Sequence, residues 1–233
     1  MEFLPPYVSI VFILTTFAAV AFLLQSTKAA GLQTLPAKIL LFILPLWIIF
    51  QAIISIGGFY QVSNPLPPRL LVFGVLPALL LIIFYFLFFR SSFIEGMPLK
   101  LLTLLHVVRI PVELVLFLLF IGGQVPRIMT FEGLNFDILS GILSPIIYLT
   151  AFRGTETKRW LLIGFNILGL ILLVNIVSIA VMSLPTPVQQ LAFDQPNRAV
   201  LFFPYVWLPT IVVPIVLFAH LSSLWKLLRP SDR

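Results

Sequence analysis

Residues Leu70–Phe89 read LLVFGVLPALLLIIFYFLFF, a run of 20 positions without one charged side chain. At 1.5 Å per residue an α-helix of this length spans about 30 Å, the thickness of the hydrocarbon core of a bilayer. A helix on the surface of a water-soluble protein needs a polar stripe, and this run has none. It therefore predicts a helix that crosses a membrane.

The rest of the chain repeats this pattern. Of its 233 residues, 61% are apolar and 9% are charged, whereas an ordinary soluble domain carries roughly 25% charged residues. Short joints with prolines and glycines separate the apolar stretches. We expect one all-α transmembrane domain over residues 1–233, a polytopic helical bundle of about seven helices, several of them kinked by proline. The predicted spans are 7–25, 39–59, 70–89, 98–121, 134–152, 160–184 and 200–224.

Basic residues accumulate at alternate joints. With the N-terminus outside, ten Lys and Arg residues fall on the cytoplasmic side and three on the outer side. Cytoplasmic loops carry an excess of Lys and Arg, so we expect the N-terminus outside and the C-terminus in the cytoplasm. A compact chain without cysteine or soluble domains suits a bacterial inner membrane, which is the expected location. The ten are Lys28, Lys38, Arg90, Lys100, Arg153, Lys158, Arg159, Lys226, Arg229 and Arg233, and the three are Arg69, Arg127 and Arg198.

The sequence lacks the residues or motifs that several classes of function require. The chain has no cysteine, which excludes disulfides, thiolate metal sites and thiol nucleophiles. It has no phosphate-binding loop, HExxH zinc motif or GxSxG nucleophile elbow. The net charge of +6 comes from residues at span ends, where topology explains it, so no nucleic-acid partner is expected. No motif specifies a reaction, and a role other than catalysis is favoured.

The fourth predicted span carries a polar stripe. His106, Arg109 and Glu113 are spaced i, i+3 and i+7, which places them within about 60° of one helix face. A charged side chain at this depth costs about 2.5–3.5 kcal/mol, so the stripe should face the interior of the bundle. Arg109 and Glu113 are four residues apart and could pair within the helix. Pro111 lies between them and should free the carbonyl of Val107 and kink the span.

Two interpretations of this stripe remain open. In the first, Arg109 and Glu113 bind a small ligand, an ion or a proton, with His106, Asn166 and Asn175 close by, because ionisable groups inside a membrane are usually functional. In the second, the protein is a non-catalytic scaffold or assembly partner, and the charges only hold helices together. The expected partners are the lipid bilayer and, in the first interpretation, a small-molecule or ion ligand.

The two histidines suggest a third interpretation. His106 follows Lys100 by six residues and His220 precedes Lys226 by six, so both should lie about 9 Å from the cytoplasmic boundary. Equal depth on separate helices is what bis-histidine ligation of haem b requires, although two histidines can match in depth by chance. No other cofactor is predicted. No metal site is predicted either, since zinc needs at least three protein ligands.

Polar residues also gather in the two long outer joints. They could form the rim of an outward-facing pocket, but we favour two solvated loops, with Asn135 and Asp137 capping the fifth helix. The rim residues would be Arg127, Glu132, Asp137, Asp194 and Arg198.

Prolines recur in the last predicted span. Pro204, Pro209 and Pro214 leave several carbonyls without helical partners, so this span is expected to be kinked or locally unwound. Broken helices often bind ions or substrates, and a generally kinked bundle is the alternative.

Overall fold

The computed structural model describes residues 4–62, 64–154 and 156–229, and every regular element in these ranges is a helix. Six of the described helices are long and apolar enough to cross a membrane, which indicates an integral membrane protein. Arg233, one of the basic residues assigned to the cytoplasmic side, lies outside the described residues. The six are Pro6–Gly31 (α1), Leu35–Ile56 (α2), Leu71–Phe88, Leu99–Ile121, Arg159–Met182 (α7) and Leu208–Leu228.

Three of these helices change their pitch shortly before a proline. The prolines are Pro77, Pro111 and Pro214, and each lacks the N–H that would bond the carbonyl four residues earlier. The local structure changes to a wider π turn or a tighter 3₁₀ turn at these points. The segments are η2 (Leu71–Val75, π) before α3 (Leu76–Phe88), η4 (His106–Val108, 3₁₀) between α4 (Leu99–Leu105) and α5 (Arg109–Ile121), and η7 (Leu208–Val212, π) before α8 (Val213–Leu228).

The predicted fifth span is a shorter helix in the structure. Helix α6 (Ile138–Ala151) has 14 residues, or about 21 Å, against a hydrocarbon core of roughly 30 Å. That it crosses the membrane stays a prediction. The long helix within the last predicted span begins at Leu208 and not at 200, because residues 202–206 form a bend and turns around Pro204. The joints contain four short 3₁₀ turns, η1 (Phe59–Gln61), η3 (Ile94–Gly96), η5 (Arg127–Met129) and η6 (Ala199–Leu201).

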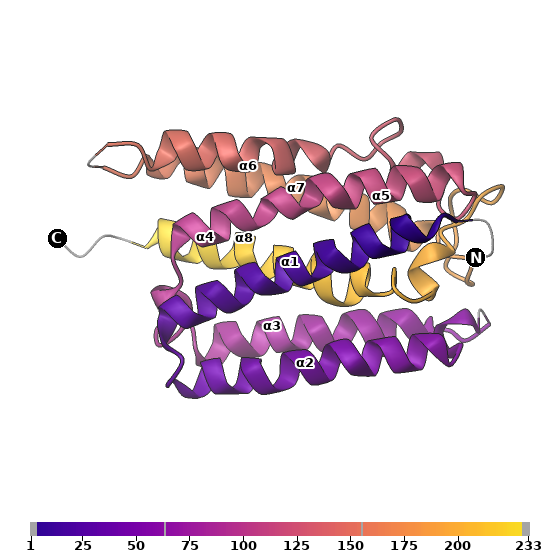
Figure 1. Ribbon diagram of the computed structural model, residues 1–233, viewed down its shortest axis with the longest axis horizontal. Coiled ribbons are helices and arrows are strands. Elements are labelled where there is room, and N and C mark those ends of the chain that lie inside the picture. The colour runs from indigo at the N-terminus through magenta and orange to yellow at the C-terminus, as the bar shows by residue number, and fades with distance from the viewer. Residues whose placement is uncertain (1–3, 63, 155, 230–233) are drawn as a thin grey trace.

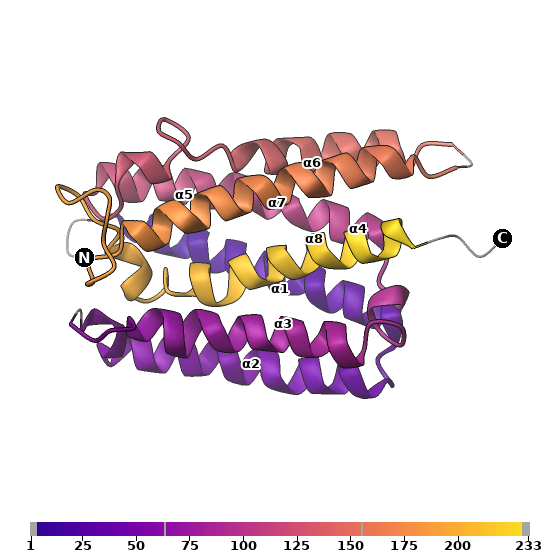
Figure 2. The ribbon, with the colours of Figure 1, turned by 180° about the vertical axis from the view of Figure 1, so that it is seen from behind.

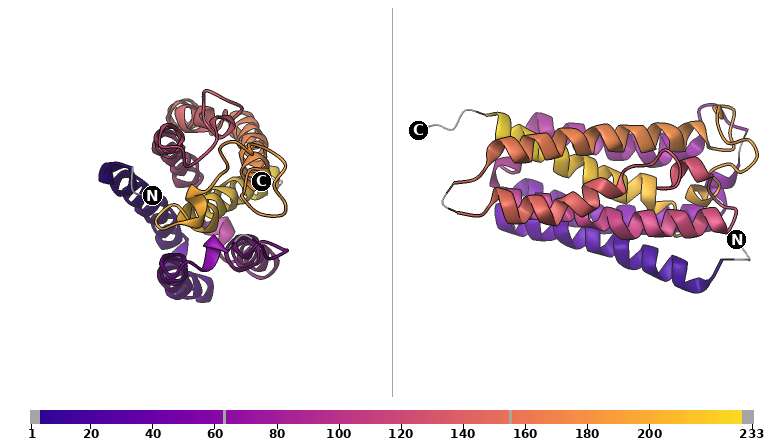
Figure 3. Two further views of the ribbon diagram at one scale, coloured as in Figure 1. Left: turned by 90° about the vertical axis from the view of Figure 1, so that its right-hand side faces the viewer. Right: turned by 90° about the horizontal axis from the view of Figure 1, so that it is seen from above.

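The helices lie side by side along one direction, and the start of α1 and the end of α8 lie at opposite ends of the bundle (Figure 1). The view from behind shows α2 and α3 along one side and α6 and α7 along the other (Figure 2). Seen end-on, α8 runs between these two groups (Figure 3). It belongs to the span with the largest buried share of the six. Helix α8 is therefore the centre of the bundle.

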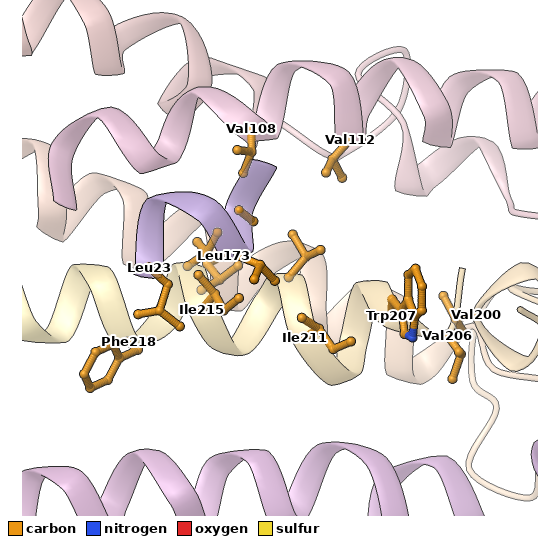
Figure 4. Packing of buried hydrophobic residues seen from close by; sticks show 14 of the residues in the cluster. Leu23, Val108, Val112, Leu173, Val200, Val206, Trp207, Ile211, Ile215 and Phe218 are labelled. Carbon is orange, nitrogen blue, oxygen red and sulfur yellow. The ribbon is translucent and has the colours of Figure 1, made fainter. Parts of the chain in front are cut away.

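The apolar core surrounds α8 (Figure 4). Val108 at the end of η4 and Val112 on α5 face α8. Ile211 on η7 and Ile215 on α8 are buried as well. The outer faces are different, because large apolar side chains such as Phe42, 70% exposed, cover them. Such surfaces suit lipid, since soluble monomers rarely expose large contiguous apolar patches.

Candidate functional site

Arg109 forms a buried ion pair with Asp137. Its Nε lies 3.2 Å from Asp137 Oδ2, and both terminal nitrogens are directed at the carbonyl oxygen of Gly169, 3.4 Å away. The guanidinium is 2% exposed and Asp137 is 6% exposed. Two expectations are therefore corrected: Arg109 does not pair with Glu113, and Asp137 makes no capping bond with its side chain.

A glycine on α6 brings this ion pair together. A Cβ atom on Gly141 would lie 2.8 Å from Ile110 Cγ1 and 3.3 Å from Arg109 Cβ, so only glycine lets α6 pack this closely on α5. Asp137 lies four residues before Gly141 and therefore on the same face of the helix. Its carboxylate thus lies beside Arg109. Ser144 continues the contact, since its hydroxyl donates to the Thr103 carbonyl at 2.8 Å.

Glu113 is held by an amide and not by a cation. Asn135 Nδ2 donates to Glu113 Oε1 at 2.6 Å and to the Met129 carbonyl at 3.0 Å. The other end of the Asn135 amide accepts from the Asp137 N–H at 3.0 Å, which fixes the turn before α6. Glu113 is 1% exposed, and no Lys, Arg or His among the described residues lies within ion-pair distance of it. The cluster thus has two buried carboxyl groups and one arginine.

A cavity of about 100 Å³ adjoins this cluster, between the π turns η2 and η7 and helices α5 and α7. One water molecule needs roughly 10–15 Å³ of cavity volume, so the cavity has room for more than one water. Glu113, Asp137 and Asn197 line it, and the rest of the lining is apolar and without an aromatic ring. In each of these three side chains one oxygen lacks a hydrogen-bond partner among the described residues: Glu113 Oε2, Asp137 Oδ1 and Asn197 Oδ1.

The structure brings the two histidines together on the other side of Arg109. The rings of His106 and His220 stack with centroids 3.7 Å apart and planes 15° apart. His220 Nδ1 lies 2.9 Å from Asn166 Oδ1, and Asn166 donates to the Leu162 carbonyl. Gly169 makes room for the stack, because a Cβ there would lie 2.2 Å from His220 Cε1.

This stack is not the arrangement that haem ligation uses. Bis-histidine ligation places the iron and its porphyrin between the rings, with one nitrogen of each ring directed at the metal. Faces 3.7 Å apart leave no room for a porphyrin between them. Haem at His106 and His220 stays a prediction, and it requires the two rings to separate.

The remaining predicted residues lie apart from the cavity. Asn175 donates to the Leu134 carbonyl at 2.8 Å and does not line the cavity. Arg127 and Glu132 form an exposed pair 3.8 Å apart. The other two rim residues, Asp194 and Arg198, are exposed.

Two asparagines that the sequence placed in solvated joints are buried instead. Asn135 and Asn197 are both 0% exposed, and both contribute to the site. Their only signal in the sequence is a polar residue beside apolar ones in a joint, which many solvated loops share.

The comparisons with known proteins identify a family but no activity. No curated protein and no solved structure matches the chain. A family model described as "Domain of unknown function (DUF8737)" matches residues 66–228, from the segment before η2 to the end of α8. The matched region includes the ion pair, Glu113, Asn197 and both histidines. It covers more than two thirds of the sequence, and the chain belongs to this DUF8737 family.

Proposed function

We propose that this membrane protein binds or transports a small ligand, an ion or a proton through the polar site formed by Arg109, Glu113 and Asp137. The observation that carries the proposal is Glu113, a buried carboxyl group that has no cationic partner in the described part of the chain and has one free oxygen beside a cavity. Helices can be held together by a matched pair such as Arg109 and Asp137. A further buried carboxyl group adds desolvation cost without a matching charge, which favours a functional reason for it.

The proposal includes the path of the chain through the membrane. Seven crossings, with α6 as the short one, bring the N-terminus to the outer side and the C-terminus to the cytoplasmic side. The start of α1 and the end of α8 lie at opposite ends of the bundle, which supports an odd number of crossings (Figure 1). The excess of Lys and Arg at alternate joints supports the direction, and a bacterial inner membrane is the proposed location.

A scaffold or assembly role is the main competitor. It predicts that substitutions at Arg109 and Glu113 change only stability, and that no small molecule or ion stabilises the wild type. The buried ion pair agrees with this role, but the free oxygens at the cavity have no place in it. Ligand binding distinguishes the two proposals, because a ligand that binds the folded state must stabilise it.

The test compares wild type with Glu113→Gln in two assays. The first measures proton flux into proteoliposomes that enclose a pH-sensitive dye under an imposed potential. The second measures the melting temperature of purified protein with a panel of small cations, anions and amines. We expect flux or ligand stabilisation in the wild type and its loss in Glu113→Gln, which should still insert and purify.

Glu132→Gln is the matched control, because it removes an exposed carboxylate of the outer joint. It should behave as wild type in both assays. Equal flux and equal ligand response in wild type and Glu113→Gln would overturn the proposed function. A wild type without flux or any ligand response would favour the scaffold.

A further inference from the structure

Among the described residues that line it, the cavity beside Glu113 has free hydrogen-bond acceptors and no free side-chain donor. The three unpartnered oxygens on its lining residues are Glu113 Oε2, Asp137 Oδ1 and Asn197 Oδ1. The Asn197 amide nitrogen is already used, since it donates to the Ala180 carbonyl at 3.2 Å. Asn135 holds the second oxygen of Glu113, and Arg109 holds the second oxygen of Asp137. A ligand that fits this wall must supply hydrogen-bond donors and positive charge.

The number and kind of these acceptors distinguish between cations. A protonated primary amine has three N–H donors, one for each free oxygen. Calcium takes six to eight oxygen ligands, and no cluster of three or more His, Cys, Asp or Glu side chains suited to a metal ion occurs among the described residues. A quaternary ammonium group has no N–H and is typically bound by aromatic rings, which this lining lacks.

The remaining walls indicate the body of the ligand. Apolar side chains from several elements, among them Leu71, Val112, Ile176 and Pro209, enclose the space. Such walls favour an alkyl group over a second charged or polar group, because a polar group there would find no partner. An amino acid is disfavoured for this reason, since the wall offers its carboxylate no donor.

We propose that this cavity binds a primary ammonium group carried on a small aliphatic body, with Glu113, Asp137 and Asn197 as its three hydrogen-bond acceptors. The inference rests on the proposed function and names the class of its ligand. Glu113 supplies the charge that balances the ammonium, because the charge of Asp137 is already paired with Arg109.

The experiment measures the melting temperature of the purified full chain at neutral pH with four probes of similar size. These probes are butylamine, butyltrimethylammonium, 1-butanol and butyrate. Butylamine should raise the melting temperature in a saturable way, and the other three should not, because each lacks the N–H donors, the positive charge or both. Phosphatidylethanolamine added to the micelles shows whether a lipid headgroup can supply the same ammonium group.

Two variants test the site from different sides. Glu113→Gln removes the balancing charge, and Ala180→Leu fills the cavity from α7. Glu113→Gln should weaken the butylamine response about tenfold or more, the size expected when a hydrogen bond to a charged group is lost. Ala180→Leu should weaken it as well, because the larger side chain takes the space of the ligand. Their controls are Glu132→Gln and Ser178→Leu, an exposed position on the same helix as Ala180, and both should respond as wild type.

The outcomes separate this inference from the proposed function. No stabilisation by butylamine or phosphatidylethanolamine, equal stabilisation by 1-butanol, or wild-type binding in both Glu113→Gln and Ala180→Leu overturns the ammonium site. If protons, sodium or an anion instead act through Glu113, the proposed function stands without it. If neither the proton flux nor the response to any tested ligand depends on Glu113, both the ammonium site and the proposed function are overturned.

Discussion

Arg109 pairs with Asp137 at the start of α6, 3.2 Å away, and not with Glu113, one turn along its own helix. The ion pair therefore joins two helices, and it leaves the second carboxyl group beside the cavity. A pair between Arg109 and Glu113 would have neutralised the stripe within one helix. Because Arg109 pairs with Asp137, the charge of Asp137 is used within the fold, and the charge of Glu113 is available to a ligand.

Breaking this ion pair should be costly. We expect Asp137→Asn to lower the free energy of unfolding by about 3–5 kcal/mol, because it leaves the charge of Arg109 buried without its partner. Titration with a denaturing detergent measures the change. Glu132→Gln breaks the exposed pair with Arg127 and should cost no more than about 1 kcal/mol. Equal losses in the two variants would show that the buried pair does not stabilise the fold.

The contact between α7 and α8 depends on a single missing side chain. Gly169→Ala places a Cβ 2.2 Å from His220 Cε1, so the stacked ring must shift or the helices must separate. We expect a loss of about 1–3 kcal/mol, the usual cost of overpacking. Gly164→Ala on the same helix meets no atom within 4 Å and should be neutral or slightly stabilising. Similar melting temperatures for the two alanine variants would contradict this packing.

Two carbonyls that prolines set free have side-chain donors from α2. Pro77 cannot bond the Phe73 carbonyl, which instead accepts from Gln51 Nε2 at 3.0 Å. Pro214 cannot bond the Thr210 carbonyl, which accepts from Trp47 Nε1 at 2.9 Å. Helix α2 thus supports both π turns that border the cavity, although the DUF8737 match begins after it.

Gln51→Leu should therefore destabilise the protein by about 1–3 kcal/mol, because it leaves the half-buried Phe73 carbonyl without a donor. It also removes the acceptor for the Tyr60 hydroxyl, which lies 2.7 Å from Gln51 Oε1. Burial raises the pKa of Tyr60 to about 12, so this hydroxyl keeps its proton over the whole neutral range. Gln61→Leu at an exposed position is the control. The measurement is again denaturation by detergent, and a neutral Gln51→Leu would contradict the argument.

The sequence predicted those parts of the site that depend on one helix alone. The spacing of His106, Arg109 and Glu113 placed them on one face, and all three are buried. Proline chemistry predicts which carbonyls lose their helical donors. Neither observation needs knowledge of a neighbouring element, because helix periodicity and the missing proline N–H are local properties.

The partners of these residues could not be predicted in the same way. Asp137 reaches Arg109 because α6 starts at Ile138 and packs through Gly141, and both facts depend on the path of the preceding joint. A polar joint normally indicates solvent, so Asn135 is expected to cap the fifth helix at the end of a solvated loop, and Asn197 to lie in the other loop. The sequence predicts similar depths for the two histidines, but the contact of their rings depends on the absent side chain of Gly169.

Whether α6 crosses the membrane can be decided with two cysteines. The chain has none of its own, so a single introduced cysteine is the only site for a thiol reagent. Glu132→Cys and Glu156→Cys lie in the exposed joints before and after α6. In intact cells, an impermeant maleimide should label the variant at position 132 and should reach position 156 only after the membrane is opened. This result requires α6 to cross the membrane. A helix of about 21 Å can cross only if the bilayer thins or the flanking residues extend the helix. Labelling of both positions from the same side would make α6 a helix that does not cross, and the fold would then have six spans.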